Sequence, residues 1–239
     1  MKINLHDLKT QIFADGADLS EITEHNRNPI IKGLTTNPSL MRKAGVENYA
    51  EFASKVLLEV VDKPISFEVI SDDLTEIERQ AHLISSWAPN VFVKIPITNS
   101  VGKSTLSMID DLTRNSIKVN VTAIMTLDQV VSLSKVLNPT IPSFVSIFAG
   151  RIADTGRDPL NCLKRSLEVL KLNLNAKVIW ASPRELLNIF QAEQIGCHAI
   201  TVNTEILHKL KFLNYDLDQY SKDTVKMFYD DALKSGYFL

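Results

Sequence analysis

Residues 91–97 read Val91-Phe92-Val93-Lys94-Ile95-Pro96-Ile97, an apolar run of strand length with one amine inside it. Side chains two apart on a strand point to the same face, so Lys94 shares a face with Phe92. If that face points into a core, the ammonium loses hydration and the neutral amine is favoured, which is the form that attacks a carbonyl. Alternatively, the lysine extends to solvent at a strand end that Pro96 closes. The stretch alone leaves both interpretations open.

Seven further runs rich in β-branched and aromatic residues accompany this one along the chain. Together, the predicted strands cover residues 11–15, 30–36, 65–70, 91–97, 118–124, 143–148, 177–182 and 198–203. Between them, apolar residues three and four apart predict helices, as in Leu160, Leu163, Leu167 and Leu170. Strands that alternate with helices indicate parallel βαβ units. About eight such units in 239 residues favour a single (β/α)8 TIM barrel in the α/β class.

Two capping residues followed by proline, Asp158-Pro159 and Ser182-Pro183, predict helix starts. Near the C-terminus an apolar stripe at helical spacing predicts a further helix, formed by Val225, Phe228, Tyr229 and Ala232. We therefore expect one domain over residues 1–239. Its barrel would cover about 11–212, and its C-terminal helix would cover about 217–236.

The bulk composition argues against several functional classes. The chain is 45% hydrophobic and 23% charged, as in a globular protein with a sizeable core, and its net charge of −2 gives no basic footprint for nucleic acid. No apolar run reaches the ~18 to 20 residues of a membrane span. Cys162 and Cys197 lie far apart, so we expect no disulfide and a cytoplasmic location. The histidines lack metal-ligand spacing and no glycine-rich nucleotide motif occurs, so we expect neither metal nor cofactor.

Polar side chains gather at the C-terminal ends of the predicted strands, where the chemistry of a (β/α)8 barrel lies. A single polar residue at a strand end usually caps a helix or makes a structural hydrogen bond. A whole ring with two carboxylates around one amine is harder to explain as structure, because each buried group costs about 1–3 kcal/mol if unpaired. The ring comprises Asp15, Thr35, Thr36, Asn37, Glu68, Lys94, Asn120, Thr122, Ser146, Ser182, Thr201 and Asn203.

Seven short motifs follow one another in order between about Ile12 and Asn203. They are Phe13-Ala14-Asp15, Thr35-Thr36-Asn37-Pro38-Ser39-Leu40, Phe67-Glu68-Val69, Val93-Lys94-Ile95-Pro96, Val119-Asn120-Val121-Thr122, Ser146-Ile147-Phe148-Ala149-Gly150-Arg151 and Ala181-Ser182-Pro183-Arg184. In this order they resemble the transaldolase family, class I Schiff-base enzymes built on a barrel. In length the chain is most similar to the shorter members, which are related to fructose-6-phosphate aldolase. The second and fourth motifs are individually distinctive.

The resemblance implies four catalytic residues. Lys94 would form an imine with the C2 carbonyl of a ketose phosphate, and the protonated imine would then act as an electron sink. Asp15 would take the proton from the C4 hydroxyl and return it when the new bond forms. Glu68 and Thr122 would hold a water that shuttles protons during imine formation and hydrolysis.

The resemblance also implies the residues that bind substrate. Those for the retained dihydroxyacetone unit would be Asn37, Asn120 and Ser146, with Thr36 beside them. A phosphate would be clamped by Arg151 and Arg184 with Ser182, since two guanidiniums suit a dianion. The expected partners are therefore sugar phosphates.

Two positions distinguish the branches of this family. Where this chain has Glu68 and Phe148, the related aldolases have Gln and Tyr. A phenol there could protonate the enamine, whereas Phe148 cannot, so the enamine should persist until an acceptor aldehyde arrives. This favours a transaldolase of the pentose phosphate pathway and carbohydrate metabolism over a fructose-6-phosphate aldolase-like lyase. A non-catalytic barrel that binds sugar phosphate is the third possibility, although it would have no reason to retain Lys94 with two carboxylates.

Five residues differ from the usual family pattern, namely Gly16, Ala17, Ile147, Trp180 and Pro183. These residues would lie at the phosphate-binding and acceptor-binding ends of the site. The identity of the sugar therefore stays open, and a specialised sugar phosphate is an alternative substrate. In the short relatives a C-terminal helix reaches over a neighbouring subunit, so we expect a homo-oligomer. The alternative is that this helix covers the bottom of the barrel.

Overall fold

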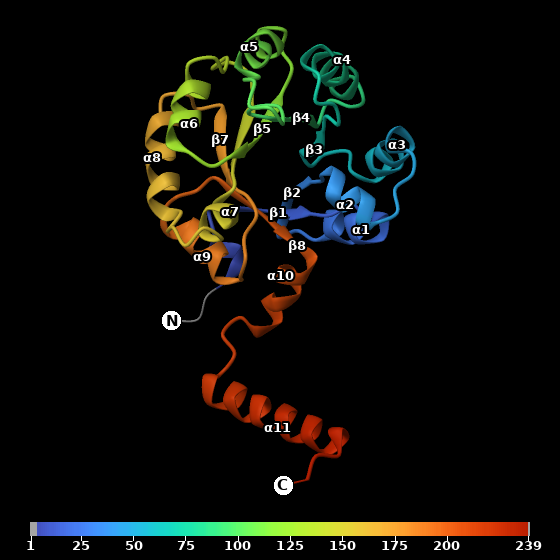
Figure 1. Cartoon of the computed structure of the whole chain (residues 1–239), viewed down its shortest axis with the longest axis vertical. Helices are drawn as coiled ribbons and strands as arrows, with labels where there is room; N and C mark the ends of the chain where they lie inside the picture. Colours follow the sequence, from blue (N-terminus) through green and yellow to red (C-terminus); the bar gives the residue numbers. More distant parts are fainter. Residues whose placement is uncertain (1–3, 239) are drawn as a thin grey trace.

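The fold is that of a computed structural model, which describes residues 4–238; the predicted domain limits of 1 and 239 lie outside this range. Parallel strands close into a barrel in sequence order (Figure 1). They are β1 (Gln11–Asp15), β2 (Ile31–Thr35), β3 (Ile65–Glu68), β4 (Val91–Pro96), β5 (Val119–Ile124), β6 (Ser143–Ile147), β7 (Ala176–Trp180) and β8 (Ala199–Asn203). Every predicted strand is present, and its ends differ from the prediction by no more than two residues. The predicted (β/α)8 barrel is thus confirmed.

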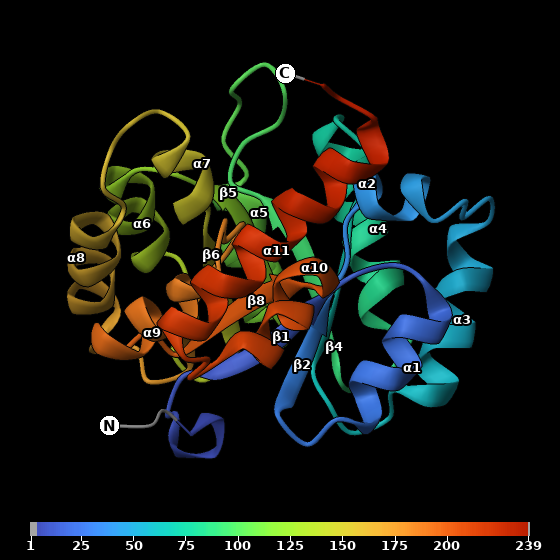
Figure 2. The same cartoon turned by 90° about the horizontal axis from the view of Figure 1, so that it is seen from below.

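Helices surround the strands, as Figure 2 shows from below. They are α1 (Leu19–Arg27), α2 (Pro38–Lys43), α3 (Tyr49–Glu59), α4 (Leu74–Ser85), α5 (Leu106–Arg114), α6 (Leu127–Ser134), α7 (Ala149–Ala153), α8 (Leu160–Leu170), α9 (Leu187–Gln194), α10 (Thr204–His208) and α11 (Leu217–Ser235), with 3-10 turns at Leu5–Asp7 and Lys209–Phe212. Asp18, Asn48 and Asp73 cap three of them, each accepting a bond from a backbone N–H in the first turn. No helix within residues 4–238 combines the length and apolar character needed to cross a membrane.

The two predicted proline starts have different outcomes. Asp158 accepts a hydrogen bond from the Leu160 N–H at 2.9 Å where α8 begins. The predicted start at Ser182-Pro183 is wrong, because α9 begins only at Leu187. Ser182 has φ 59°, a left-handed conformation that no α-helix continues. Its carbonyl oxygen lies 1.6 Å from where a Cβ on Gly150 would be, so the segment turns tightly against α7 before the helix starts.

The lower part of the barrel lumen is filled by a separate apolar cluster, which we call the lumen floor. Its members are Phe13, Phe92, Phe144, Ile179 and Ala199. The Phe144 ring lies 4.3 Å from that of Phe92 and 5.4 Å from that of Phe13, measured between centroids. A Cβ on Gly33 would lie 2.7 Å from the Phe13 ring, so the missing side chain on β2 makes room for that ring. The alternation predicted for β4 is confirmed, because Phe92 packs within this cluster and Val93 within the outer core.

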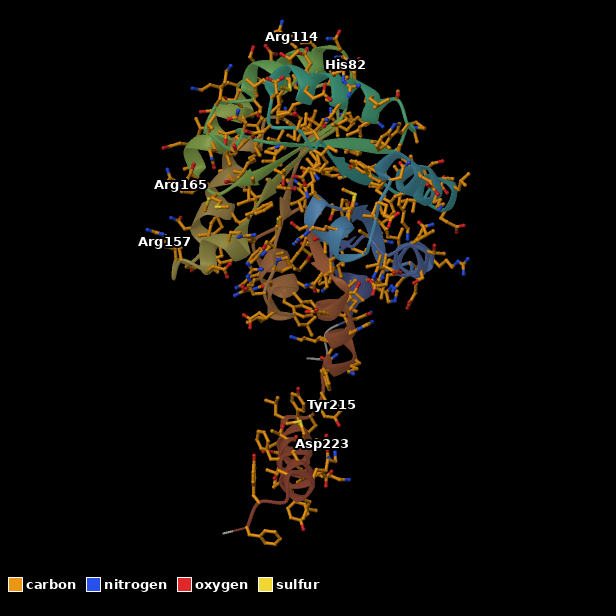
Figure 3. All side chains as sticks on the ribbon, turned by 45° about the vertical axis from the view of Figure 1, so that its right-hand side comes forward. His82, Arg114, Arg157, Arg165, Tyr215 and Asp223 are labelled. Atoms are coloured by element: carbon orange, nitrogen blue, oxygen red, sulfur yellow. The ribbon has the colours of Figure 1, made fainter. Side chains whose placement is uncertain are left out.

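The C-terminal helix α11 stands apart from the barrel (Figure 1). None of its residues is buried, and Val225, Phe228 and Tyr229 are 62–64% exposed. The alternative in which this helix covers the barrel bottom is therefore not found. Tyr215 and Asp223, labelled in Figure 3, are joined by a 2.7 Å hydrogen bond that fixes the first turns of the helix to the segment before it.

Candidate active site

A cavity of about 500 Å³ opens at the C-terminal ends of the strands. Nine of the eleven predicted site residues line it, and the two that do not are Thr36 and Asn120. The strands thus bring together side chains that are far apart in the sequence. The nine are Asp15, Asn37, Glu68, Lys94, Thr122, Ser146, Arg151, Ser182 and Arg184.

Lys94 lies two residues before the end of β4, and only 6% of it is exposed. Its Nζ atom is 3.1 Å from Glu68 Oε2 on the neighbouring strand β3 and donates a 3.1 Å hydrogen bond to the Thr36 carbonyl oxygen. The register pairs Lys94 directly with Glu68, which explains their contact. The alternative in which the ammonium extends to solvent is not found. The amine instead lies in the cavity beside a carboxylate that can exchange a proton with it.

Asp15 ends β1 and lines the same cavity. Its Oδ1 atom accepts a 2.7 Å hydrogen bond from the Thr35 hydroxyl on β2, and that hydroxyl lies 2.6 Å from the Thr201 hydroxyl on β8. Burial raises the pKa of Asp15 above its ordinary value, although the charge of Lys94 and the bond from Thr35 act in the opposite direction. A carboxyl group with a raised pKa holds a proton more readily than an ordinary aspartate, which suits a group that must both accept and return one.

A chain of buried polar groups lies beneath the cavity. The Ser146 hydroxyl donates to Asn120 Oδ1 at 2.7 Å, and Asn120 Nδ2 donates to the Ser66 hydroxyl at 2.9 Å. Asn120 is completely buried, so it fixes Ser146 from below instead of lining the cavity. The Oγ1 atoms of Thr36 and Thr122 have no hydrogen-bond partner among the described residues. Thr122 lines the cavity, and its hydroxyl oxygen is buried at the cavity wall.

Backbone strain accompanies two of these positions. Ala123, next to Thr122, has φ 59°, and the pairing of β5 with β6 shifts register at this point. Ser182 has the same φ immediately before Pro183. A left-handed non-glycine residue costs of the order of 1–3 kcal/mol, and such residues cluster at functional sites. The strain therefore lies next to Thr122 and at Ser182 itself, two of the residues predicted to act there.

The other end of the cavity carries two arginines, Arg151 from α7 and Arg184 from the segment after β7. Arg184 binds Asp154 with two hydrogen bonds, from Nε to Oδ1 at 2.9 Å and from Nη2 to Oδ2. The hydrogen bond from Arg184 holds the pKa of Asp154 below its ordinary value. Both side chains of this pair are about half exposed, so an anion that enters the cavity can reach the guanidinium.

Thr35 and Thr201 are among the polar cavity residues to which the sequence analysis assigned no role. Both belong to the predicted ring of polar residues at the strand ends, and this membership was the signal in the sequence that could have assigned them to the site. Their hydrogen bonds run across β8, β1 and β2, and the sequence does not reveal such cross-strand contacts. Within residues 4–238, no three His, Cys, Asp or Glu side chains form a group that could hold a metal ion.

The geometry can be compared with known proteins. The family model described as Transaldolase/Fructose-6-phosphate aldolase matches residues 12–236. A "Probable transaldolase" of Herpetosiphon aurantiacus is 32% identical over 201 residues, covering 84% of this chain and 86% of that protein. A "Probable transaldolase 2" of Listeria monocytogenes is 33% identical, covering 84% of this chain and 88% of that protein. A "Probable transaldolase" of Methanococcus maripaludis is 32% identical, with 84% and 89% covered.

Among solved structures, a mandelate oxidase variant with a flavin adduct matches with a TM-score of 0.55 and 10% sequence identity. The match covers 85% of this chain and 71% of that one. At this identity the likeness concerns the barrel fold alone.

Proposed function

The chain belongs to the transaldolase/fructose-6-phosphate aldolase family, and from this premise we propose that it is a transaldolase that works through a Schiff base on Lys94. It would move a dihydroxyacetone unit from a ketose phosphate to an aldose phosphate. One observation carries the proposal: a buried lysine and two carboxylates, Glu68 and Asp15, line one cavity at the barrel mouth. A lysine in that position supplies the electron sink itself, so the chemistry needs no cofactor.

In the first step Lys94 attacks the C2 carbonyl of the ketose. Its ammonium must lose a proton beforehand, and Glu68 at 3.1 Å is placed to accept it. The carbinolamine then loses water as its hydroxyl is protonated, which leaves a protonated imine. Thr122, whose hydroxyl has no partner among the described residues, would orient the departing water.

In the second step the C3–C4 bond breaks. The Asp15 carboxylate takes the proton from the C4 hydroxyl, the C4 oxygen becomes the carbonyl of a departing aldehyde, and the bonding electrons move into the iminium to give an enamine. When an acceptor aldehyde binds, the enamine attacks it and Asp15 returns the proton to the new hydroxyl. Hydrolysis of the imine then frees Lys94.

The remaining lining residues would hold the substrate. Asn37 and Ser146, which line the cavity, would hydrogen-bond the retained hydroxyls, and Arg151 and Arg184 with Ser182 would bind a phosphate. We propose that Asn120 and Thr36 act from beneath the cavity. Asn120 fixes the Ser146 hydroxyl, and the Thr36 carbonyl oxygen fixes Lys94 Nζ.

Phe148 supports transfer over simple cleavage. It lines the cavity at a position where the related aldolases carry tyrosine, and its ring has no proton to give the enamine. The alternative function is an aldolase-like lyase that releases dihydroxyacetone. The test is dihydroxyacetone formation from fructose 6-phosphate with and without erythrose 4-phosphate. Transfer with slow release supports the proposal, rapid release without acceptor indicates the lyase, and a protein inert in both assays is the non-catalytic barrel.

We further propose that α11 binds a second copy of this chain. Large apolar side chains on it and just beyond it are at least half exposed, which is unusual for a monomer's surface. They are Leu217, Val225, Met227, Phe228, Tyr229, Leu233, Tyr237 and Phe238. Removing residues 217–239 should convert the oligomer to monomers in size-exclusion chromatography with light scattering. An unchanged mass would contradict this part of the proposal.

We also propose a cytoplasmic location. Cys162 and Cys197 are both free thiols, which fits a reducing compartment. Labelling of both cysteines in the freshly isolated, denatured protein by a thiol reagent tests this, and a blocked pair would argue against it.

A further inference from the structure

Three neighbouring strands place three oxygen atoms in a row at the barrel mouth. Asp15 on β1 and Thr35 on β2 are register partners. Thr201 lies on β8, the other neighbour of β1, and its hydroxyl reaches past β1 to that of Thr35. The distances are 2.7 Å from the Thr35 hydroxyl to Asp15 Oδ1 and 2.6 Å from the Thr35 hydroxyl to the Thr201 hydroxyl. Thr35 is 3% exposed and Thr201 is 6% exposed, so bulk solvent does not compete for these bonds.

Counting protons fixes the direction of each bond. A threonine hydroxyl has one proton to donate and lone pairs that accept. When Asp15 is ionised, Thr35 donates to it, so Thr201 must be the donor to Thr35. When Asp15 carries its proton on Oδ1, it can donate to Thr35, which then donates to Thr201. The row therefore satisfies both protonation states, and only the hydroxyl protons rotate.

From this geometry we propose that Thr35 and Thr201 form a reversible hydroxyl pair that positions Asp15 and keeps it hydrogen-bonded whether it is ionised or protonated. The inference rests on the proposed function, in which Asp15 alternates between these states in every cycle. Both threonines are positioning residues, because they act on the substrate through Asp15. Burial raises the pKa of Asp15 and the bond from Thr35 lowers it, so the loss of that bond should alter the titration of Asp15.

Other charged groups surround Asp15 and contribute to its titration in every variant. Asp15 lines both the main cavity and an adjoining one of about 370 Å³. The charged and titratable groups of the first are Glu68, Lys94, Arg151 and Arg184. Those of the second are Asp18, Glu21, Lys43, Glu205 and His208. Because these groups are unchanged in threonine variants, a difference between two such variants reports on the hydroxyl pair.

The two threonines make opposite predictions. In Thr35→Val the ionised Asp15 carboxylate loses a charge-assisted hydrogen bond, and the neutral acid loses a weaker one. The ionised form is therefore penalised more, and the acid limb of the pH profile of kcat/KM for cleavage should move to higher pH. In Thr201→Val the ionised state keeps its bond from Thr35. In the proposed pair the proton of Asp15 is on Oδ1, so in this variant the protonated state leaves the Thr35 O–H without an acceptor, which penalises that state. The acid limb should therefore move to lower pH.

The experiment measures kcat/KM against pH for both valine variants, with Thr35→Ser and Thr201→Ser as controls that keep the hydroxyls. We expect kcat/KM at the optimum to fall about tenfold to a hundredfold in Thr35→Val and less in Thr201→Val. Both serine variants should have limbs close to the wild type. Borohydride trapping of dihydroxyacetone should persist in all four, because that imine forms without the C4 proton transfer.

The hydroxyl pair is overturned if the acid limbs of the two valine variants move in the same direction or do not move. It is also overturned if the serine variants show the same shifts as the valine variants. If Thr35→Val does not fold, Thr201→Val carries the test alone, and any result other than a shift to lower pH overturns the inference. If wild-type protein traps no ketone, the proposed function fails instead, which keeps the two failures distinct.

Discussion

The lumen floor and the barrel mouth are built by the same strands, two residues apart on the same inward face, yet they serve opposite purposes. The floor holds aromatic rings in contact, with 4.3 Å between the Phe92 and Phe144 centroids. The mouth holds an amine, two carboxylates and a set of hydroxyls. Four strands, β1, β4, β6 and β8, change from one to the other in a single step along the face, as the pairs Phe13/Asp15, Phe92/Lys94, Phe144/Ser146 and Ala199/Thr201 show.

The comparison indicates that the lumen floor contributes stability and the barrel mouth contributes the chemistry. Burying the rings of the floor is favourable, and the rings hold the strands at a fixed spacing. At the mouth, burial raises the pKa of Asp15, which means that the ionised form is less stable there than in water. The mouth therefore reduces the stability that the floor provides. Variants of the mouth should lose activity and keep stability, and variants of the floor should do the reverse.

The sharpest contrast is expected from Asp15→Asn. The amide cannot exchange the C4 proton, so turnover should fall about 10²- to 10⁴-fold. Thermal stability at neutral pH should stay equal or rise, because the buried charge is gone. Since the raised pKa of Asp15 penalises only the ionised form, any gain should be largest above that pKa and vanish at acidic pH. Thermal denaturation at several pH values measures this, with exposed Asp62→Asn as the control. A large loss of stability in Asp15→Asn would contradict the claim that the barrel mouth reduces the stability of the protein.

Phe144→Ala tests the opposite region. Truncating a buried phenylalanine costs about 3 to 5 kcal/mol of unfolding free energy. The variant should unfold at lower urea concentration while its folded fraction still traps substrate on Lys94. Leu172→Ala is the matched control, because that side chain is 95% exposed and should change stability by less than about 0.5 kcal/mol. A stable Phe144→Ala protein that cannot trap substrate would place the chemistry, not the packing, at the floor.

The arginine end of the mouth should show a smaller effect that depends on substrate. Replacing Arg151 or Arg184 with Ala removes a charge-assisted phosphate contact of about 1.5 to 3 kcal/mol. KM should therefore rise about tenfold to a hundredfold for phosphorylated donors and little for unphosphorylated ones. Arg157→Ala, at the periphery in Figure 3, is the control.

A split between the two arginines would revise this part of the site. If only Arg151→Ala raises KM, Arg184 stays with Asp154 when substrate binds, and Pro183 has moved the clamp.

The smallest change is expected from Phe148→Tyr, which adds a phenol at the mouth and leaves the floor intact. The phenol should protonate the enamine and raise acceptor-independent dihydroxyacetone release several-fold, with less efficient transfer. Release is measured with and without erythrose 4-phosphate in both proteins. Equal release by the two proteins would show that this ring does not decide between transfer and cleavage.

Most of the barrel could be predicted from the sequence, because parallel strands buried on both faces form continuous apolar runs between amphipathic helices. The ring of polar strand ends likewise contains ten of the residues that line the cavity, since strand ends of one barrel face a common mouth. The sequence did not reveal that Asn120 lies beneath the cavity, because parity gives the face of a side chain and not its depth.

Two other features depend on contacts between distant segments. The false helix start at Pro183 follows from the left-handed Ser182, whose carbonyl packs against Gly150, and a local cap pattern does not contain that contact. The exposed position of α11 depends on what the rest of the chain leaves uncovered, which an apolar stripe alone does not specify.

The central claim is that Lys94 forms a covalent imine with a ketose phosphate. Borohydride reduction of the protein with fructose 6-phosphate, followed by peptide mass mapping, tests it most directly. The account predicts one adduct, on Lys94, that is absent from Lys94→Arg, because arginine stays protonated and cannot form the imine. Thermal denaturation would show that the variant keeps its fold. An adduct that persists in Lys94→Arg, or that maps to Lys103 or Lys118, would contradict the claim.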